Sequence, residues 1–292
     1  MMRRILPLIA ILLATSAHAE WWEARTDHFV IYAEGPPAET KAFAQKLERF
    51  DGALRSLQTV TFKPITSDAQ RVTVYRFGDT SDIGRLLGSR SVAGFYRPRL
   101  GGSVAFTPAR QELNLVKSLT PRDRRTDLDP QSVLFHEYTH SFMFQSFPAA
   151  YPSWYIEGFA ETAATIVLKD DGTFHIGNPP QYRSDALFGG LNYSIKRMLL
   201  TSDKPDLEDV YGRYTYGWLL THFLTFEPSR KGQLVTYLKL INAGTDMSEA
   251  ARKAFGDLDR LQSDVERYKN HRPLPGALVK PATIVDRPAL SL

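Results

Sequence analysis

Two histidines and a glutamate lie together inside an apolar stretch of the chain, in the sequence His136-Glu137-Tyr138-Thr139-His140. Residues four apart point about 40° from each other around an α-helix, so both imidazoles can bind one metal ion. Glu137 then stands beside the ion rather than on it. Burying such polar groups costs free energy unless something satisfies them, and a zinc ion does so. The spacing therefore predicts a zinc site on a buried helix.

A third ligand is expected shortly downstream, where the apolar segment WYIEGFAE at residues 154–161 contains Glu157. Three protein ligands leave the fourth zinc position for water, as a catalytic site requires. A closed structural site would need a fourth histidine or carboxylate, since the chain has no cysteine. The spare histidines His175 and His222 have no ligand spacing to a partner. A catalytic zinc site is therefore expected.

Glu161 follows Glu157 by about one helical turn and is expected on the same side of the helix. There it can accept the free ring N–H of a ligating histidine and fix its tautomer. The alternative is an ordinary helix carboxylate that faces solvent, and the sequence leaves both open.

The segments HEYTH and WYIEGFAE resemble the gluzincins, which include thermolysin and aminopeptidase N, and look most like the peptidase MA-like group. The resemblance covers residues 130–165. It implies a zincin-like fold, a zinc ion on His136, His140 and Glu157, and Glu137 as the general base that activates water.

A downstream Tyr-x-x-Gly pattern of the aminopeptidase branch is matched by Tyr214-Thr215-Tyr216-Gly217. The resemblance implies that the Tyr214 hydroxyl stabilises the oxyanion of the tetrahedral intermediate. Tyr211 and Tyr216 lie close by in sequence and remain alternatives for this role. Tyr214 is otherwise an aromatic residue that packs a helix against the core.

Two departures from the family pattern bear on geometry and specificity. The interval from His140 to Glu157 is shorter than usual, which suggests a tighter turn between the two helices. No exopeptidase-type segment precedes the motif, and residues 94–106 offer Arg97 and Arg99 but no acid to hold a free amine. We therefore expect an endopeptidase, with the strand at residues 102–106 as the edge that pairs with an extended peptide.

The expected reaction is hydrolysis of a peptide or protein substrate by zinc-activated water, with Glu137 transferring the proton. One alternative is a catalytically silent zincin-like protein that serves as a periplasmic binding or scaffold module. Another is a metallohydrolase that acts on non-peptide substrates. The same ligands also accept other divalent metals.

The elements that must position these residues predict an α+β fold with the active site between two lobes. An N-terminal α/β lobe at residues 20–128 is expected to hold strands at 28–32 and 71–77, a helix at 38–57, and a hairpin of 92–96 with 103–106. The connection at 107–127 is charged and irregular.

Residues 129–270 predict a mostly helical lobe that carries the zinc site. Asp129 and Pro130 are typical of an N-cap and a first helical position. The chain should turn at Asp170-Asp171-Gly172. The remaining helices are expected at residues 152–168, 194–200, 214–226, 232–241 and 248–268, followed by a proline-rich extended tail at 271–292.

Residues 1–19 are typical of a signal peptide, with basic residues, a short apolar run and the small-x-small site Ala17-His18-Ala19. We expect an exported protein, periplasmic or secreted, with no membrane span after cleavage; an uncleaved anchor is the alternative. The net charge is +4, of which Arg3 and Arg4 supply two, so nucleic acid is not expected as a partner. The oligomeric state leaves no signal in the sequence.

Overall fold

The computed structural model describes most of the chain, and the structural statements below refer to that part. The expected signal peptide, most of the connection at 107–127, and the last part of the expected tail lie outside it, as does the side chain of Tyr211. The described residues are 20–57, 65–88, 94–97, 99, 102–110, 129–146, 149–189, 192–200 and 207–281.

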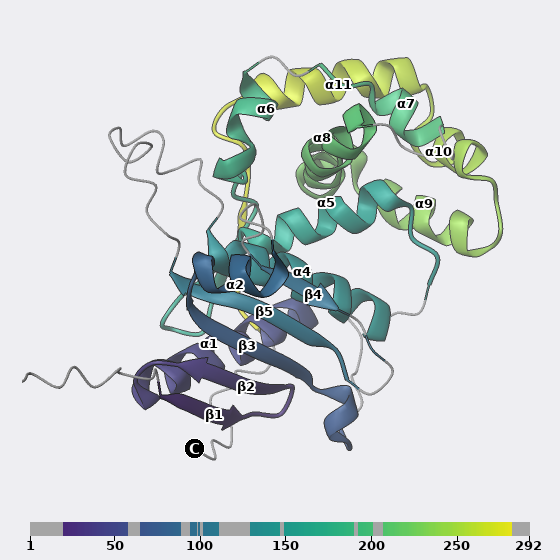
Figure 1. The fold of residues 1–292 in the computed structure, drawn as a ribbon. Coiled ribbons are helices and arrows are strands. Elements are labelled where there is room, and N and C mark those ends of the chain that lie inside the picture. Colours follow the sequence, from purple (N-terminus) through teal and green to yellow (C-terminus); the bar gives the residue numbers. More distant parts are fainter. Residues whose placement is uncertain are drawn as a thin grey trace, which may run out of the picture.

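The fold is mixed α/β and is built on a five-stranded sheet with the strand order β1-β2-β3-β5-β4 (Figure 1). The two parallel pairs, β2 with β3 and β3 with β5, occupy the centre, and antiparallel β1 and β4 form the edges. Parallel neighbours need a crossover, which a helix supplies between β2 and β3. The strands are β1 (Trp21–Arg25), β2 (Phe29–Glu34), β3 (Val72–Asp79), β4 (Phe95–Arg97) and β5 (Val104–Arg110).

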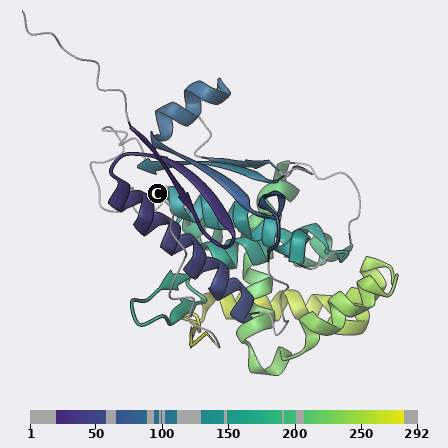
Figure 2. The ribbon, with the colours of Figure 1, turned by 90° about the horizontal axis from the view of Figure 1, so that it is seen from below.

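Two helices, α1 (Pro37–Leu57) and α4 (Pro130–Ser146), cover one face of this sheet side by side (Figure 2). They touch through the stacked rings of Phe50 and Phe135. A shorter helix, α2 (Thr80–Leu87), packs along β3 and β5. The apolar cluster beneath the sheet thus includes residues of α4, beyond the expected lobe boundary at residue 128.

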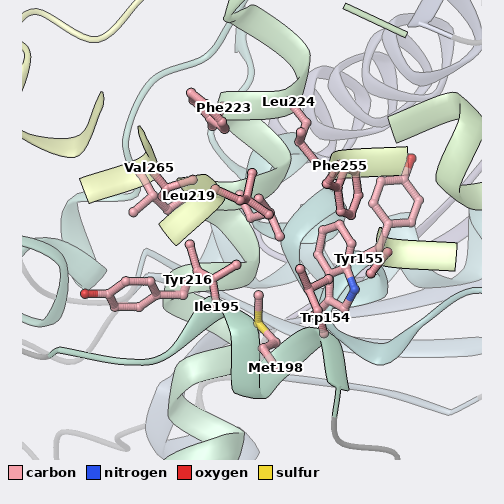
Figure 3. Close-up of a cluster of buried hydrophobic side chains, with 14 of the residues drawn as sticks. Trp154, Tyr155, Ile195, Met198, Tyr216, Leu219, Phe223, Leu224, Phe255 and Val265 are labelled. Carbon is pink, nitrogen blue, oxygen red and sulfur yellow. The ribbon is translucent and has the colours of Figure 1, made fainter. Parts of the chain in front are cut away.

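The second half of the described chain is mostly helical and has its own apolar cluster (Figure 3). At its centre α5 (Ser153–Ala164) packs between α4 and α8 (Leu207–Phe226). The other helices of this half are α6 (Ser184–Phe188), α7 (Ile195–Leu200), α9 (Gln233–Asn242), α10 (Met247–Phe255) and α11 (Leu258–Asn270), with 3-10 turns η2 (Gln181–Arg183) and η3 (Pro228–Arg230). A further 3-10 turn, η1 (Asp68–Gln70), precedes β3 in the first half.

Several expected elements are present, and others end elsewhere. The backbone N–H of Ser132 donates to the Asp129 carboxylate at 3.1 Å, which confirms the expected N-cap. The helix expected at 152–168 ends at Ala164, and the expected helix at 248–268 is two helices because Gly256 adopts a left-handed φ of 77°.

The expected tail contributes a strand. Within a three-stranded sheet, β7 (Phe174–Ile176) lies between β6 (Val167–Leu168) and β8 (Ala277–Val279). Among the described helices, none combines the length and apolar character needed to cross a membrane.

The strand expected to pair with substrate is not an edge. Residues 104–110 form β5, which is hydrogen-bonded to β3 on one side and to β4 on the other. The expectation was wrong because β4, which overlaps the expected hairpin strand at 92–96, pairs with β5 on its outer side. Within the described sheet, the edge strand beside α4 is therefore β4.

Candidate metal centre

The helices α4 and α5 bring His136, His140 and Glu157 together. The Nε2 atoms of the two histidines lie 3.0 Å apart. The Oε2 atom of Glu157 lies 3.2 Å from Nε2 of His136 and 3.5 Å from Nε2 of His140. Each residue therefore points one ligand atom at a common position.

The spacing of these three atoms fits a zinc ion. Ligands at about 2.0–2.1 Å from a tetrahedral zinc are separated by roughly 3.3 Å, and the observed separations of 3.0, 3.2 and 3.5 Å bracket that value. Oε2 of Glu157 is buried and has no hydrogen-bond partner among the described residues. A buried carboxylate oxygen without a partner is costly, and a cation at the common position would satisfy it.

Burial and neighbouring charges shift the pKa values of the site residues. Burial favours the neutral form of Glu157, but the imidazoles of His136 and His140 close to its carboxylate outweigh burial and lower its pKa to about 2. Burial also opposes a charge on His136, yet the surrounding glutamates raise its pKa. The pKa of Glu137 is raised, chiefly by burial and also by the charge of Glu157.

Glu137 borders the open space next to these ligands. A cavity of about 610 Å³ is lined by Glu137 and by the ligands His140 and Glu157. Its other described lining residues are the largely apolar Tyr96, Phe144 and Ile156, and the polar Arg99, Ser103, Ser141 and Gln145. The Tyr96 hydroxyl donates to Oγ of Ser141 at 2.5 Å, which fixes this wall between β4 and α4.

Glu161 lies behind His136 and is buried, with 1% of its surface exposed, so the solvent-facing alternative is wrong. Its Oε1 atom is 3.8 Å from Nδ1 of His136. The same carboxylate accepts hydrogen bonds from Arg183 Nη2 at 2.8 Å and from the Tyr182 hydroxyl at 2.6 Å. Glu161 therefore faces the ligand histidine and two donors from η2.

Tyr214 also reaches the site from α8. Its ring lies 5.9 Å from the His136 ring at an interplanar angle of 27°. Burial and the charges of Glu157 and Glu137 raise its pKa to about 12, which keeps the hydroxyl protonated. Tyr216, by contrast, is fully buried in the helical cluster, and its hydroxyl accepts a hydrogen bond from Lys269.

Two glycines allow α5 and α8 to approach closely enough to bring Glu157 and Tyr214 together. A Cβ atom on Gly158 would lie 2.3 Å from the carbonyl oxygen of Gly217. One on Gly217 would lie 2.5 Å from the carbonyl oxygen of Trp154. The glycines of the two sequence patterns thus set the backbone contact between these helices.

The two spare histidines lie away from this centre. His222 is buried, and its ring nitrogens are taken by the Gly177 carbonyl and the Tyr268 hydroxyl. His175 lies in β7. Tyr182 and Arg183 were not expected at the site, because no spacing within the chain links η2 to the motif on α4.

The chain was also compared with known proteins. No protein-family model and no curated protein sequence matches it.

Proposed function

We propose that this chain is an exported zinc-dependent peptidase of the gluzincin type. One observation carries the proposal: two imidazole nitrogens and a buried carboxylate oxygen converge at zinc-ligand separations, and Glu137 lines the cavity beside them. The zincin-like assignment rests on the motifs and on this convergence.

His136, His140 and Glu157 would hold the ion. Zinc bound there would supply a Lewis acid and favour ionisation of water near neutral pH. Glu137 lines the same cavity, where a carboxylate can take a proton from water and return it to a leaving amine. The protonated hydroxyl of Tyr214 supplies a donor for the negative charge that develops on the carbonyl oxygen.

The proposed substrate is a peptide in an extended conformation, and β4 is the edge strand of the described sheet beside α4 at which such a chain could add. The cavity next to Glu137 has walls of Tyr96, Phe144 and Ile156, and Phe144 is half exposed. Apart from Glu137 and the ligands, the charged residue among the described lining residues is Arg99, which cannot hold a free amine. We therefore propose cleavage within chains rather than removal of single N-terminal residues.

The decisive experiment compares purified wild type with Glu137→Gln. We expect about one zinc per chain in both, because Glu137 is not a ligand. Hydrolysis of a mixed peptide library should fall at least about 10²-fold in the variant, since a positioned general base contributes about 10²- to 10⁴-fold.

Three outcomes separate the rival functions. Wild type that binds no zinc, even after incubation with the metal, would sink the proposal. Wild type that binds zinc but cleaves no peptide would favour the silent binding or scaffold protein, or a metallohydrolase for other substrates. Unchanged turnover in Glu137→Gln would remove the role given to Glu137.

A further inference from the structure

The guanidinium of Arg183 contacts both the carboxylate beside His136 and the ring of Tyr214. Arg183, at the end of η2, donates to Oε1 of Glu161 through Nη2 at 2.8 Å and through Nε at 3.2 Å. Its guanidinium carbon also lies 4.9 Å from the centre of the Tyr214 ring. A single side chain therefore contacts a buried carboxylate beside His136 and the ring proposed to carry the oxyanion donor.

The carboxylate end of this arrangement is strongly fixed. Glu161 is almost completely buried, and each of its oxygens accepts a charged or short hydrogen bond: Oε1 from Arg183, and Oε2 from the Tyr182 hydroxyl at 2.6 Å. Charge-assisted bonds of this kind hold a carboxylate in one orientation. Oε1, the oxygen held by Arg183, is also the one that faces Nδ1 of His136 at 3.8 Å.

The aromatic end is fixed by stacking. The face of a phenol attracts a guanidinium, and a planar cation between rings restricts their tilt. Arg183 has the Tyr182 ring at 5.4 Å and the Tyr214 ring at 4.9 Å. Tyr214 in turn lies against the His136 ring. Among the described residues, no other arginine or lysine is paired with Glu161 or stacked on Tyr214.

We propose that Arg183 is a positioning residue that aligns both halves of the site, holding His136 through Glu161 and holding Tyr214 through stacking. The expected effect of Arg183 on kcat rests on the proposed function. Its expected effect on zinc affinity holds whether or not the substrate is a peptide. Tyr182 positions Glu161 but not Tyr214. Its hydroxyl donates to Glu161, and its ring lies against Arg183, which in turn lies against Tyr214.

The test measures zinc affinity by competition with a chromophoric chelator, together with kcat and KM on a cleaved peptide. Loss of a group that orients a ligand histidine typically weakens metal binding by about 10- to 100-fold. We expect Arg183→Met to show such a loss and a fall in kcat that exceeds the change in KM. Arg183→Lys should recover zinc affinity in part but not kcat, because an ammonium pairs with Glu161 without stacking on Tyr214. Tyr182→Phe should weaken zinc binding with a smaller effect on kcat.

Arg230→Met is the matched control. Arg230 also pairs with a largely buried carboxylate, that of Asp264, and lies 5.6 Å from the ring of Phe223. None of its described hydrogen-bond partners, which are Gln233, Phe255 and Asp264, belongs to the metal site. It should leave zinc affinity and kcat within about twofold of wild type, even if the fold is destabilised.

The outcomes distinguish this inference from the proposed function. Wild-type zinc affinity and kcat in Arg183→Met, or equal losses in Arg230→Met, would overturn the positioning role while leaving the peptidase proposal intact. Wild type that binds zinc without cleaving peptides would refute the peptidase, and the zinc affinities would still decide whether Arg183 acts through Glu161. Wild type without zinc would overturn both.

Discussion

At the scale of single residues, the side chains around the ligand atoms come from different helices. Glu137 belongs to α4 and lines the cavity, whereas Tyr214 belongs to α8 and reaches His136 from another side. The proposed base acts on water and the proposed donor acts on the carbonyl oxygen, so the two groups have separate roles. Because they lie on different helices, each can be replaced without changing the other. Their contributions are therefore open to separate measurement.

Replacing Tyr214 by phenylalanine tests the oxyanion role. The variant keeps the ring that packs on His136 and lies against Arg183, but loses the hydroxyl. Loss of one oxyanion donor typically lowers kcat by about 10²- to 10³-fold, and we expect a fall of this size with KM and zinc content unchanged. Steady-state kinetics on a cleaved peptide and metal analysis check it.

Tyr216→Phe is the control for this prediction, because the Tyr216 hydroxyl lies in the helical cluster next to Lys269. It should keep wild-type kcat. The reverse pattern, with activity lost in Tyr216→Phe and kept in Tyr214→Phe, would show that the oxyanion role was given to the wrong tyrosine.

The residues of the candidate site differ in how far the sequence reveals them. His136 and His140 share one helix, so their geometry follows from a spacing of four, and Glu157 stands out as a carboxylate in an apolar helix. Arg183 meets Glu161 only because the chain returns through β6, β7 and η2. That path depends on tertiary packing, which no local pattern encodes.

At the scale of elements, the crossing of α5 and α8 determines where Glu157 and Tyr214 lie. Gly158 and Gly217 bring the two backbones into contact, and each motif residue is close to its glycine in sequence. A side chain at the crossing would push the helices apart. The glycines in the two patterns are therefore part of the site's geometry as well as of the fold.

Gly217→Ala should destabilise the protein and weaken the metal site together. In an exposed helix the same change stabilises by up to about 1 kcal/mol, because alanine is the better helix former. Here the new Cβ would meet the Trp154 carbonyl oxygen at 2.5 Å. Overpacking of a core costs about 1–3 kcal/mol, so we expect a lower free energy of unfolding in urea and a weaker zinc affinity.

Gly212→Ala provides a control on the same helix. Its Cβ would meet the ring of Tyr193 at 2.5 Å rather than the backbone of α5. It should also lower the free energy of unfolding, but leave zinc affinity close to that of wild type. A more stable Gly217→Ala, or equal zinc losses in both variants, would contradict the role given to the crossing.

The sequence predicts the elements with strong periodicity better than their ends. The helix that begins at Asp129 and Pro130 was expected where it occurs, because capping is a local effect. Val167 and Leu168 continue an apolar run, yet they pair with β7 once the turn at Asp170-Asp171-Gly172 brings that strand back. The strand β8 could not be expected, since its partner in β7 is about a hundred residues earlier in the chain.

At the scale of the whole molecule, two apolar clusters adjoin at the candidate site. The cluster under the sheet contains residues of α1 and α4, while the helical cluster contains residues of α5 and α8. The histidine ligands come from α4 and Glu157 comes from α5. Anything that fixes α4 against α1 therefore also fixes half of the site.

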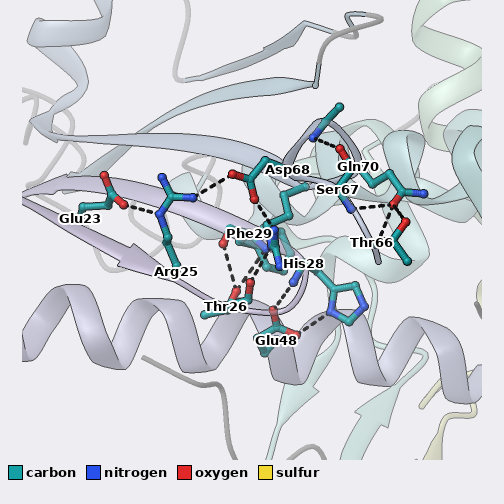
Figure 4. A network of polar contacts seen from close by, with 12 residues as sticks. Glu23, Arg25, Thr26, His28, Phe29, Glu48, Thr66, Ser67, Asp68 and Gln70 are labelled. Atoms are coloured by element: carbon teal, nitrogen blue, oxygen red, sulfur yellow. Dashed lines mark hydrogen bonds and ion pairs between the residues drawn. The ribbon is translucent and has the colours of Figure 1, made fainter. Parts of the chain in front are cut away.

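A buried polar group provides such a connection. His28 Nδ1 lies 2.8 Å from Glu48 and 3.4 Å from Asp51, both on α1, and Figure 4 shows the contact with Glu48. Asp51 also accepts hydrogen bonds from Arg55 and, at 2.7 Å, from the hydroxyl of Tyr138 on α4. Both carboxylates are 1% exposed. Asp51 keeps Arg55 when His28 is removed, whereas the buried charge of Glu48 loses its ion-pair partner.

This group predicts how stability depends on pH. Burial opposes the charge on His28, but Glu48 and Asp51 outweigh burial and Arg55, and the pKa of His28 rises above 6.5. The stabilisation is therefore complete below pH 6.5 and is lost as pH rises through the folded-state pKa. Burial also opposes the charge on Glu48, yet His28 lowers the pKa of this carboxyl below 4.5. The stabilisation by Glu48 is therefore present above pH 4.5 and is lost as pH falls through its folded-state pKa.

We compare the free energies of unfolding of wild type and His28→Gln, and call their difference the stability gap. This gap should be widest between about pH 4.5 and 6.5 and should shrink at lower and at higher pH, because Glu48 is protonated on one side and His28 loses its proton on the other. Removing one partner of a buried pair costs about 3–5 kcal/mol, which sets an upper bound for the gap because the His28 side chain is 17% exposed. Urea unfolding of both proteins from pH 4 to 9 measures it, and because they share the metal site, its own titration cancels in the difference. His271→Gln, at the exposed end of α11, is the matched control and should give a small gap at every pH. A His28→Gln gap that is constant with pH, or that widens above pH 7, would show that His28 is not the charged partner of these two carboxylates.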